Sequence, residues 1–167
     1  MIGGHGGNIY ELARQVGCDP AEIIDLSSNV NPLGPPAGLC DNLVRQIDTV
    51  SALPEVDNQG IIRCYAEHLG IPADRLIAGN GTTQFIYSIP AVLKVNRALI
   101  VGPTYSDYAD ACRLHGVSPE FFLCRESDDF RPDLAGLAEA AAGADTVFIC
   151  NPNNPTGTLI PTDEHKQ

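Results

Sequence analysis

Basic residues are scarce in this chain of 167 residues, and tryptophan is absent. Ten lysines and arginines stand against 21 aspartates and glutamates, so the net charge is −11. Binding of nucleic acid needs a basic face that neutralises phosphates, and the sequence has no cluster of basic residues to supply one. No apolar run is long enough to span a bilayer, and the first residues lack the basic and apolar segments of a signal peptide. We therefore expect neither a nucleic acid partner nor a membrane partner.

Metal-binding patterns are missing as well. The six cysteines form no CxxC pair, and no histidine lies at the spacing of a zinc site. Several cysteines sit within apolar runs, as in "FFLC" and "VFIC". We interpret them as reduced, buried thiols of a cytoplasmic protein, and we expect no metal.

The composition as a whole, 44% hydrophobic and 19% charged, is typical of a globular chain with one hydrophobic core. Apolar strands alternate with segments of helical spacing, and the turns between them are short. We predict strands at 22–28, 75–79, 97–102, 120–124 and 145–150. We predict helices at 8–17, 39–50, 61–70, 82–93, 106–116 and 133–143. This alternation predicts an α/β fold with a mainly parallel sheet and helices on both of its faces.

Three loops directly follow predicted strands: "GNGTT" at 79–83, "GPTYSDY" at 102–108 and "NPNNPTG" at 151–157. Ligands of open α/β sheets bind beyond the carboxyl ends of the strands. We therefore expect the three loops to open on one edge of the sheet and to carry the functional residues.

Each loop has chemistry that suits a ligand. The glycines of 79–83 let the backbone approach an anion, while the helix start and the hydroxyls of Thr82 and Thr83 supply donors for a phosphate. Tyr105 could stack on a flat heterocycle, and a fixed asparagine amide in 151–157 could bind a phenolic or carbonyl oxygen. Each loop also has an ordinary alternative: a strand-to-helix connection, a tyrosine packed at a rim, and an asparagine-rich turn before a helix near "PTDEHK".

The stretch "NPNNPTG" after an apolar strand resembles the aminotransferase class I/II family of fold-type-I pyridoxal-phosphate (PLP) enzymes. Its spacing to "GNGTT" and "GPTYSDY" matches that family too. The opening "HGGNIYELAR", followed by "IDLSSNVNPLGPP", is most similar to threonine-phosphate decarboxylases of cobalamin biosynthesis. Histidinol-phosphate aminotransferases are close relatives that share the "NxNPxGP" stretch. The resemblance covers the whole chain and implies the N-terminal half of such an enzyme, with PLP as its cofactor.

The resemblance also implies cofactor contacts. The backbone and hydroxyls around Gly81, Thr82 and Thr83 would hold the cofactor phosphate. Tyr105 would stack on the pyridine ring, and Asn154 would form a hydrogen bond with its phenolic oxygen.

Substrate contacts follow from the same resemblance. Asn31 would meet the substrate carboxylate, and His5 and Gly6 belong to an arm that would meet the substrate phosphate. For His5, an unordered start to the chain is the alternative.

A domain organisation is implied as well. Residues 1–36 would form an N-terminal arm and a segment of the small domain. Residues 37–167 would form the N-terminal part of the PLP-binding large domain, without the rest of it. Members of this family are homodimers that bind a small phosphorylated amino acid or amine, and we expect the same here.

Two departures from the family are visible. Leu53 stands where relatives carry a tyrosine that reaches the cofactor phosphate of the partner subunit, and a leucine cannot donate a hydrogen bond. The family's lysine, which holds PLP as a Schiff base, lies well beyond "NPNNPTG". The only lysines here, Lys94 and Lys166, do not match it. We therefore predict no catalytic residue in this chain and no activity for the chain alone.

Three functions stay open on the sequence. The parent enzyme is predicted to decarboxylate O-phospho-threonine, and a histidinol-phosphate-type aminotransferase is the first alternative. The second alternative is a non-catalytic fragment or binding module.

Overall fold

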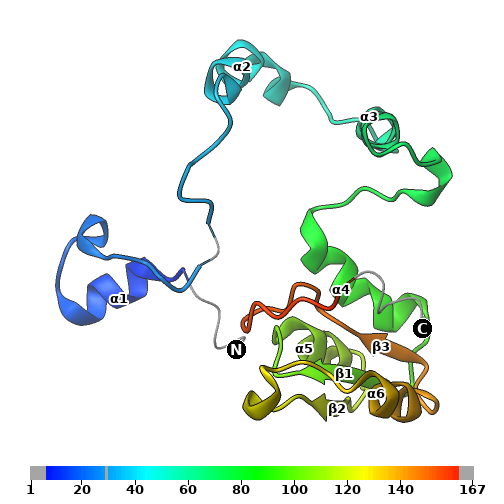
Figure 1. The fold of residues 1–167 in the computed structure, drawn as a ribbon. Coiled ribbons are helices and arrows are strands. Elements are labelled where there is room, and N and C mark those ends of the chain that lie inside the picture. Colours follow the sequence, from blue (N-terminus) through cyan, green and yellow to red (C-terminus); the bar gives the residue numbers. More distant parts are fainter. Residues whose placement is uncertain (1–6, 29, 162–167) are drawn as a thin grey trace. The chain divides into compact units, whose positions relative to one another are not determined.

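The computed structural model describes residues 7–28 and 30–161, which belong to two units, Met1–Ala78 and Gly79–Gln167. Figure 1 shows the helices of the first unit in blue to green and the sheet of the second unit in green to orange. The longest helix has 12 residues, and no helix within the described ranges is long and apolar enough to cross a bilayer. The helix predicted near "PTDEHK" lies almost wholly outside the described residues.

The first unit consists of helices and connecting loops. Its elements are α1 (Ile9–Val16), η1 (Pro20–Glu22), α2 (Leu39–Arg45), η2 (Ile47–Ser51), α3 (Gln59–Leu69) and η3 (Ala73–Arg75). The predicted helices are confirmed, although the one at 39–50 divides into an α-helix and a 3-10 turn. At the start of α1 the Asn8 side chain accepts the N–H of Glu11 at 3.2 Å, which satisfies a donor that the helix leaves free.

Two predicted strands of the first unit are wrong. Residues 22–28 and 75–79 form no strand; Ile23 and Leu76 are extended, but neither segment pairs with a strand of the described residues. At 22–28 the Asp25 carboxylate instead accepts the backbone N–H of Ser27 and the hydroxyls of Ser27 and Ser28. An apolar, extended segment forms a strand only when its backbone makes a ladder of hydrogen bonds with a neighbouring strand.

The second unit carries the sheet. Its elements are α4 (Gly81–Val92), β1 (Ala98–Gly102), α5 (Asp107–Leu114), β2 (Glu120–Leu123), η4 (Glu126–Asp128), α6 (Leu134–Ala141) and β3 (Thr146–Phe148). The three strands are parallel in the order β2-β1-β3, with Ile100 opposite Phe121 on one side and Phe148 on the other. The predicted strands and helices of this unit are confirmed. Helix α4 ends two residues after Pro90, as expected for a residue that lacks a backbone N–H.

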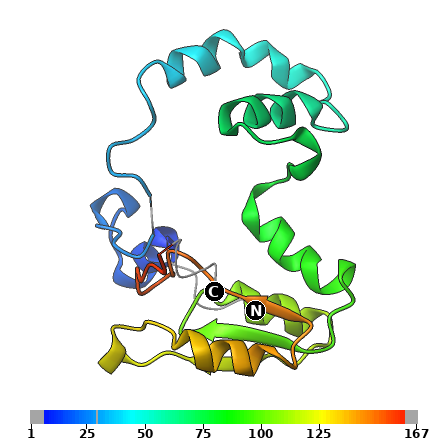
Figure 2. The ribbon, with the colours of Figure 1, turned by 45° about the vertical axis from the view of Figure 1, so that its right-hand side comes forward.

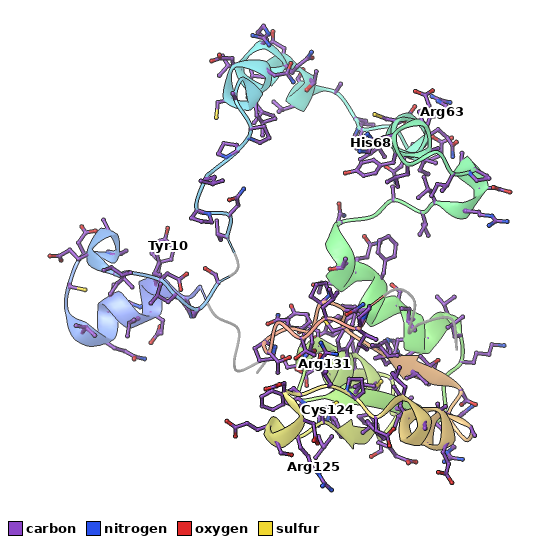
Figure 3. All side chains as sticks on the ribbon, in the orientation of Figure 1. Tyr10, Arg63, His68, Cys124, Arg125 and Arg131 are labelled. Atoms are coloured by element: carbon purple, nitrogen blue, oxygen red, sulfur yellow. The ribbon has the colours of Figure 1, made fainter. Side chains whose placement is uncertain are left out.

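The core of the second unit lies on both faces of the sheet, because all five residues of β1 are buried. Ala98 and Ile100 face a cluster that includes Ala109 and Cys112 of α5. Leu99 and Val101 alternate with them and pack on the other face, against Leu137 of α6 and the partly buried Cys124 labelled in Figure 3. Figure 2 shows α5 and α6 on opposite sides of the strands. The prediction of a parallel sheet covered by helices on both faces is confirmed.

The cysteines are free among the described residues, but the expected burial holds only in part. Cys112 is fully buried in the core, whereas Cys40 and Cys64 are exposed on the helices of the first unit. The prediction of burial is wrong for these two, because neither lies in an apolar strand of the kind that surrounds Cys124 and Cys150.

Asp145 fastens the start of β1 to the start of β3. One oxygen of its carboxylate accepts the N–H of Arg97 at 2.9 Å and that of Asn96 at 2.8 Å. In return the N–H of Asp145 donates to the Arg97 carbonyl at 2.8 Å. These hydrogen bonds, that from Arg97 first, lower the pKa of Asp145 below its ordinary value.

Truncation of Ile100 tests the central packing. Ile100 is 1% exposed, so Ile100→Ala leaves a cavity in the core and should lower the unfolding free energy by about 2–5 kcal/mol. Urea unfolding followed by far-ultraviolet circular dichroism measures the change. The control is Leu114→Ala at the end of α5, where the side chain is 68% exposed, and the expected change is within about 0.5 kcal/mol. Equal losses in the two variants would contradict the burial of Ile100.

The Asp145 contact predicts a dependence of stability on pH. A carboxylate with a lowered folded pKa stabilises the fold above the ordinary aspartate value of about 4, and this contribution disappears as the pH falls through the folded pKa. Asp145→Asn should therefore be less stable than the parent at pH 7, and the difference should shrink on acidification. Urea unfolding at a series of pH values measures it. Glu139→Gln on α6 removes a charge without removing a backbone hydrogen bond and serves as the control. A difference for Asp145→Asn that is independent of pH would refute the linkage.

Candidate functional site

The start of α4 offers free donors beside open space. Gly81 has φ +75, and apart from its chain neighbours and the backbone of its own helix turn, no heavy atom lies within 4 Å of the place where a β-carbon would stand. The N–H groups of Asn80 and Gly81 are used by the Gln84 side chain at 2.6 Å and the Gly79 carbonyl at 3.0 Å. The next N–H groups belong to the first turn of the helix, which lacks intrahelical acceptors. This helix start, together with the exposed hydroxyl residues Thr82 and Thr83, can hold an anion.

Gly79 packs closely against the side chains of α4. A β-carbon on this residue would lie 2.6 Å from the Phe85 ring and 2.9 Å from the Gln84 side-chain oxygen. Because real β-carbons do not come so close to a neighbouring atom, a larger residue here would require the Phe85 and Gln84 side chains to move. Gly79 thus packs against side chains of α4, whereas Gly81 leaves space in which a ligand can approach the loop.

Tyr105 lies in the connection between β1 and α5 and reaches the α4 loop. The side chains of Asp107 and Thr83 both act on its hydroxyl and change the pKa of Tyr105. Its ring meets the Tyr108 ring edge-on, with centroids 6.0 Å apart and planes at 86°. The first and second of the predicted loops are therefore brought together by one half-buried tyrosine.

The electrostatic surroundings keep these phenols protonated. The hydrogen bond to Asp107 raises the pKa of Tyr105, burial adds to the rise, and the hydrogen bond from Thr83 opposes it. Burial, followed by a hydrogen bond with Cys150, raises the pKa of Tyr108 to about 12. Both rings therefore act as neutral, hydrogen-bonding surfaces near neutral pH.

Asn153 joins the third loop to the second. Its amide donates to the Pro103 carbonyl at 2.9 Å and to the Thr156 hydroxyl at 2.7 Å. Its side-chain oxygen accepts the Thr104 hydroxyl at 2.7 Å. Its backbone N–H and carbonyl bind Thr158 and Gly157 within the loop. One side chain thus connects the ends of β1 and β3.

The side chains of the other two asparagines of this loop differ in their hydrogen bonds. Asn151 folds back on the chain, since its amide and its carbonyl oxygen bind the backbone of Ile160 at 3.0 and 2.9 Å. The Asn154 side chain makes no hydrogen bond to any residue that the structure describes, and it is only half-buried. Asn154 is therefore the amide of the loop that is available to a ligand.

The predicted cofactor residues thus fall into one place. Gly81, Thr82, Thr83, Tyr105 and Asn154 all belong to the second unit, at the carboxyl ends of β1 and β3 or at the start of α4. Lys94 lies at the opposite edge of the sheet, because it follows α4 and precedes the start of β1.

The predicted substrate residues lie in the first unit or outside the described residues. Asn31 belongs to the first unit, where its side chain accepts the N–H of Leu33 at 3.0 Å and donates to the Gly34 carbonyl at 3.4 Å. His5 and Gly6 lie outside the described residues, as does Lys166. Leu53, the residue in place of the family's tyrosine, is 95% exposed.

Two residues were missed by sequence reasoning. The sequence gives Asp107 no role beyond the predicted helix at 106–116, yet its side chain is 2% exposed and affects the pKa of Tyr105. Asn153 was one of three similar asparagines, and nothing in the order of residues distinguishes the one that holds two loops together. An aspartate two residues after a candidate stacking ring was the only available signal.

Comparison with known proteins gives the fold and the family. The family model described as "Aminotransferase class I and II" matches residues 21–167. A threonine-phosphate decarboxylase of Salmonella typhimurium is 36% identical over 155 residues, and a histidinol-phosphate aminotransferase of Methanococcus maripaludis is 29% identical over 161 residues. The matches cover 93% and 94% of this chain but only 43% of each relative, so the chain spans about two fifths of the length of these relatives.

Solved structures agree with this result. The histidinol-phosphate aminotransferase of Clostridium acetobutylicum matches 86% of the chain and 42% of its own, with a TM-score of 0.75 and 29% identity. The L-threonine-O-3-phosphate decarboxylase of Porphyromonas gingivalis matches the same shares with a TM-score of 0.73 and 27% identity. The sheet covered on both faces is thus part of the fold-type-I large domain that the sequence predicted. The chain belongs to the aminotransferase class I and II family.

Proposed function

We propose that this chain is the N-terminal part of an enzyme that binds PLP at the carboxyl edge of the sheet in the second unit. The observation that supports this most is the convergence of three loops with different chemistry. One loop offers helix N–H groups, the second offers a neutral ring, and the third offers an amide that is not used by its own loop. A phosphorylated heterocycle with a ring oxygen needs these three kinds of contact.

The residues present fit the group in detail. Gly81, Thr82 and Thr83 would hold the phosphate through the helix start and the hydroxyls. The Tyr105 ring would lie against the heterocycle, because aromatic faces stack favourably when offset. Asn154 would donate to the ring oxygen. When bound, PLP supplies an electron sink for the carbon from which a substituent departs.

The remaining roles of the chain's residues concern the substrate. Asn31 would bind the substrate carboxylate, and His5 and Gly6 would bind its phosphate. The Asn31 amide donates to the Gly34 carbonyl at 3.4 Å, which is a long hydrogen bond. A substrate carboxylate, as a stronger acceptor, could replace this carbonyl. The domain boundary near residue 36 and the homodimer stay predictions. Leu53 stands where relatives carry a tyrosine, so in the homodimer no hydroxyl from this position would reach the cofactor phosphate of the partner subunit.

We propose a cytoplasmic enzyme.

The reaction we propose is the decarboxylation of O-phospho-threonine. The support is the 36% identity to the Salmonella typhimurium threonine-phosphate decarboxylase, against 29% for the histidinol-phosphate aminotransferase of Methanococcus maripaludis. Histidinol-phosphate amino transfer is the second candidate, because the TM-score of 0.75 with the histidinol-phosphate aminotransferase of Clostridium acetobutylicum exceeds the score of 0.73 with the decarboxylase of Porphyromonas gingivalis. The chain alone would not turn over substrate, since neither Lys94 nor Lys166 matches the family's cofactor lysine.

Two asparagines of the third loop give a matched test of the cofactor site. In the full-length protein, Asn154→Ala should weaken PLP binding by about tenfold, because one hydrogen bond to a charged oxygen is lost, with little change in thermal stability. Asn153→Ala should lower the unfolding free energy by roughly 1–3 kcal/mol, since Pro103 and Thr104 lose their partner. Absorbance titration with PLP and differential scanning calorimetry measure the two effects. The reverse pattern would exchange the roles assigned to the two side chains.

An assay of full-length protein loaded with PLP distinguishes the two proposed reactions. We expect release of CO2 from O-phospho-threonine and no amino transfer from histidinol phosphate to 2-oxoglutarate. Gas detection and a coupled glutamate assay follow the two reactions in parallel, and the 167-residue chain alone serves as the inactive control. Amino transfer without CO2 would replace the decarboxylase by the second candidate, and the absence of both would reject an enzyme of either kind.

A further inference from the structure

A chain of hydrogen-bonded side chains crosses the carboxyl edge of the sheet in the second unit. It begins at Thr104, whose hydroxyl donates to the Asn153 side-chain oxygen at 2.7 Å. The Asn153 amide donates to the Thr156 hydroxyl at 2.7 Å, and this hydroxyl donates to that of Thr158 at 3.0 Å. The Thr158 hydroxyl ends the chain at the Asp129 carbonyl, 3.1 Å away. The chain therefore joins all three strand ends, because Thr104 follows β1, Asp129 follows β2 and the other members follow β3.

Two backbone carbonyls fix the direction of the hydrogen bonds in this chain. The Asn153 amide also donates to the Pro103 carbonyl at 2.9 Å. Because a carbonyl only accepts, the nitrogen of Asn153 must face Pro103, and the Thr104 hydroxyl must donate to the oxygen. At the other end the Asp129 carbonyl accepts the Thr158 proton, which leaves the Thr158 oxygen to accept from its neighbour. Each threonine of the chain thus uses its single hydroxyl proton within the chain.

Thr158 also closes the loop that contains Asn154. Its carbonyl accepts the N–H of Asn153 at 2.8 Å, and the Asn153 carbonyl accepts the N–H of Gly157 at 2.7 Å. These backbone hydrogen bonds close residues 153–158 into a loop with Asn154 inside it. The Thr158 hydroxyl ties the closed loop to the connection between β2 and α6, and the Asn153 side chain ties it to the connection after β1.

The acceptor at Asp129 belongs to a turn with a defined backbone. Asp129 and Phe130 have φ +51 and φ +56, a left-handed conformation that residues other than glycine rarely adopt. The Phe130 N–H donates to the carbonyl of Arg125, which is labelled in Figure 3, at 2.9 Å. The Thr158 hydroxyl therefore binds a carbonyl whose position is set by the hydrogen bonds of its own turn.

We propose that Thr158 is a positioning residue of the cofactor site, which anchors the loop of Asn154 to the turn at Asp129. This inference rests on the proposed function, because Asn154 is positioned for the proposed cofactor. The direction of the Asn154 amide depends on the backbone of the closed loop, which Asn153 and Thr158 hold from two sides. Since its proton goes to Asp129, the Thr158 hydroxyl has none to donate to the cofactor itself.

Two substitutions separate the hydroxyl of Thr158 from its methyl group. In the full-length protein, Thr158→Val keeps the shape of the side chain without the hydroxyl, and Thr158→Ser keeps the hydroxyl. Thr158→Val should weaken PLP binding about threefold to tenfold, the factor that corresponds to one neutral hydrogen bond, while Thr158→Ser binds as the parent does. Absorbance titration measures both, and Thr146→Val at the opposite end of β3 is the control without an effect. Parent-like binding by Thr158→Val, or an equal loss in Thr158→Ser, would overturn the positioning role.

A double variant tests whether Thr158 acts through Asn154. Asn154→Ala removes the amide that the loop positions, so Thr158→Val should cause little further loss of PLP binding in that background. Losses that multiply in the double variant would mean that Thr158 affects binding by another route, and they would also overturn the proposal.

Hydrogen exchange of cofactor-free protein supplies a readout that needs no cofactor. The N–H groups of Asn153 and Gly157 are bonded within the loop, so Thr158→Val should speed their exchange and Thr158→Ser should not. Mass spectrometry of a peptide that covers residues 149–160 measures the exchange, and an unchanged rate in Thr158→Val would contradict the anchoring. If Thr158→Val does not fold, Thr156→Val breaks the chain one link earlier, and parent-like PLP binding in that variant would refute the proposal.

The two proposals fail in different ways. Parent protein that binds no PLP would reject the proposed function, while hydrogen exchange would still report whether Thr158 anchors the loop. Parent protein that binds PLP, with exchange and binding both unchanged in Thr158→Val, would reject the positioning role alone.

Discussion

The side chain of Asn153 is the contact on which the candidate site depends. Parallel strands end at the same edge of a sheet, but their loops have no backbone ladder to hold them once the strands stop. Asn153 replaces that ladder, because it binds the Pro103 carbonyl and the Thr104 hydroxyl of the neighbouring loop. A short amide with two donors and one strong acceptor can make these contacts at once. It is thus a hydrogen-bonded link between the residues beyond β1 and those beyond β3.

Tyr105 extends this connection to the third element. Its backbone is held by the loop that Asn153 fastens, and its hydroxyl reaches both Asp107 and Thr83. The start of α4, the start of α5 and the end of β3 are therefore linked through two polar side chains. Both faces of the sheet beneath are packed with apolar side chains, so the polar contacts are concentrated at the edge where a ligand can reach them. The rigidity of the core is what allows so few contacts to define the site.

The sheet of the second unit could be predicted, and the loops at its carboxyl edge could be located, because their signals are local. Apolar runs of strand length, a glycine turn before a helix and an asparagine-proline loop each report on their own neighbourhood. The strands predicted at 22–28 and 75–79 failed for the opposite reason. Their side chains have the right pattern, but a strand also needs a partner, and the described chain provides none. The exposed thiols of Cys40 and Cys64 show the same limit, since burial is a property of what surrounds a helix.

By itself, the sequence determined the kinds of chemistry at the site, the helices and central strands, and the family through the order of its motifs. These follow from residue type and spacing along the chain. The resemblance singled out Asn154, but only the tertiary structure decided that Asn153 holds the loop together and that Asp107 is buried. Asn151, Asn153 and Asn154 have the same side chain, so their roles differ only through the neighbours that folding brings to them. Asp107 differs from exposed aspartates in the same way, because residue type alone favours exposure and only the fold buries it.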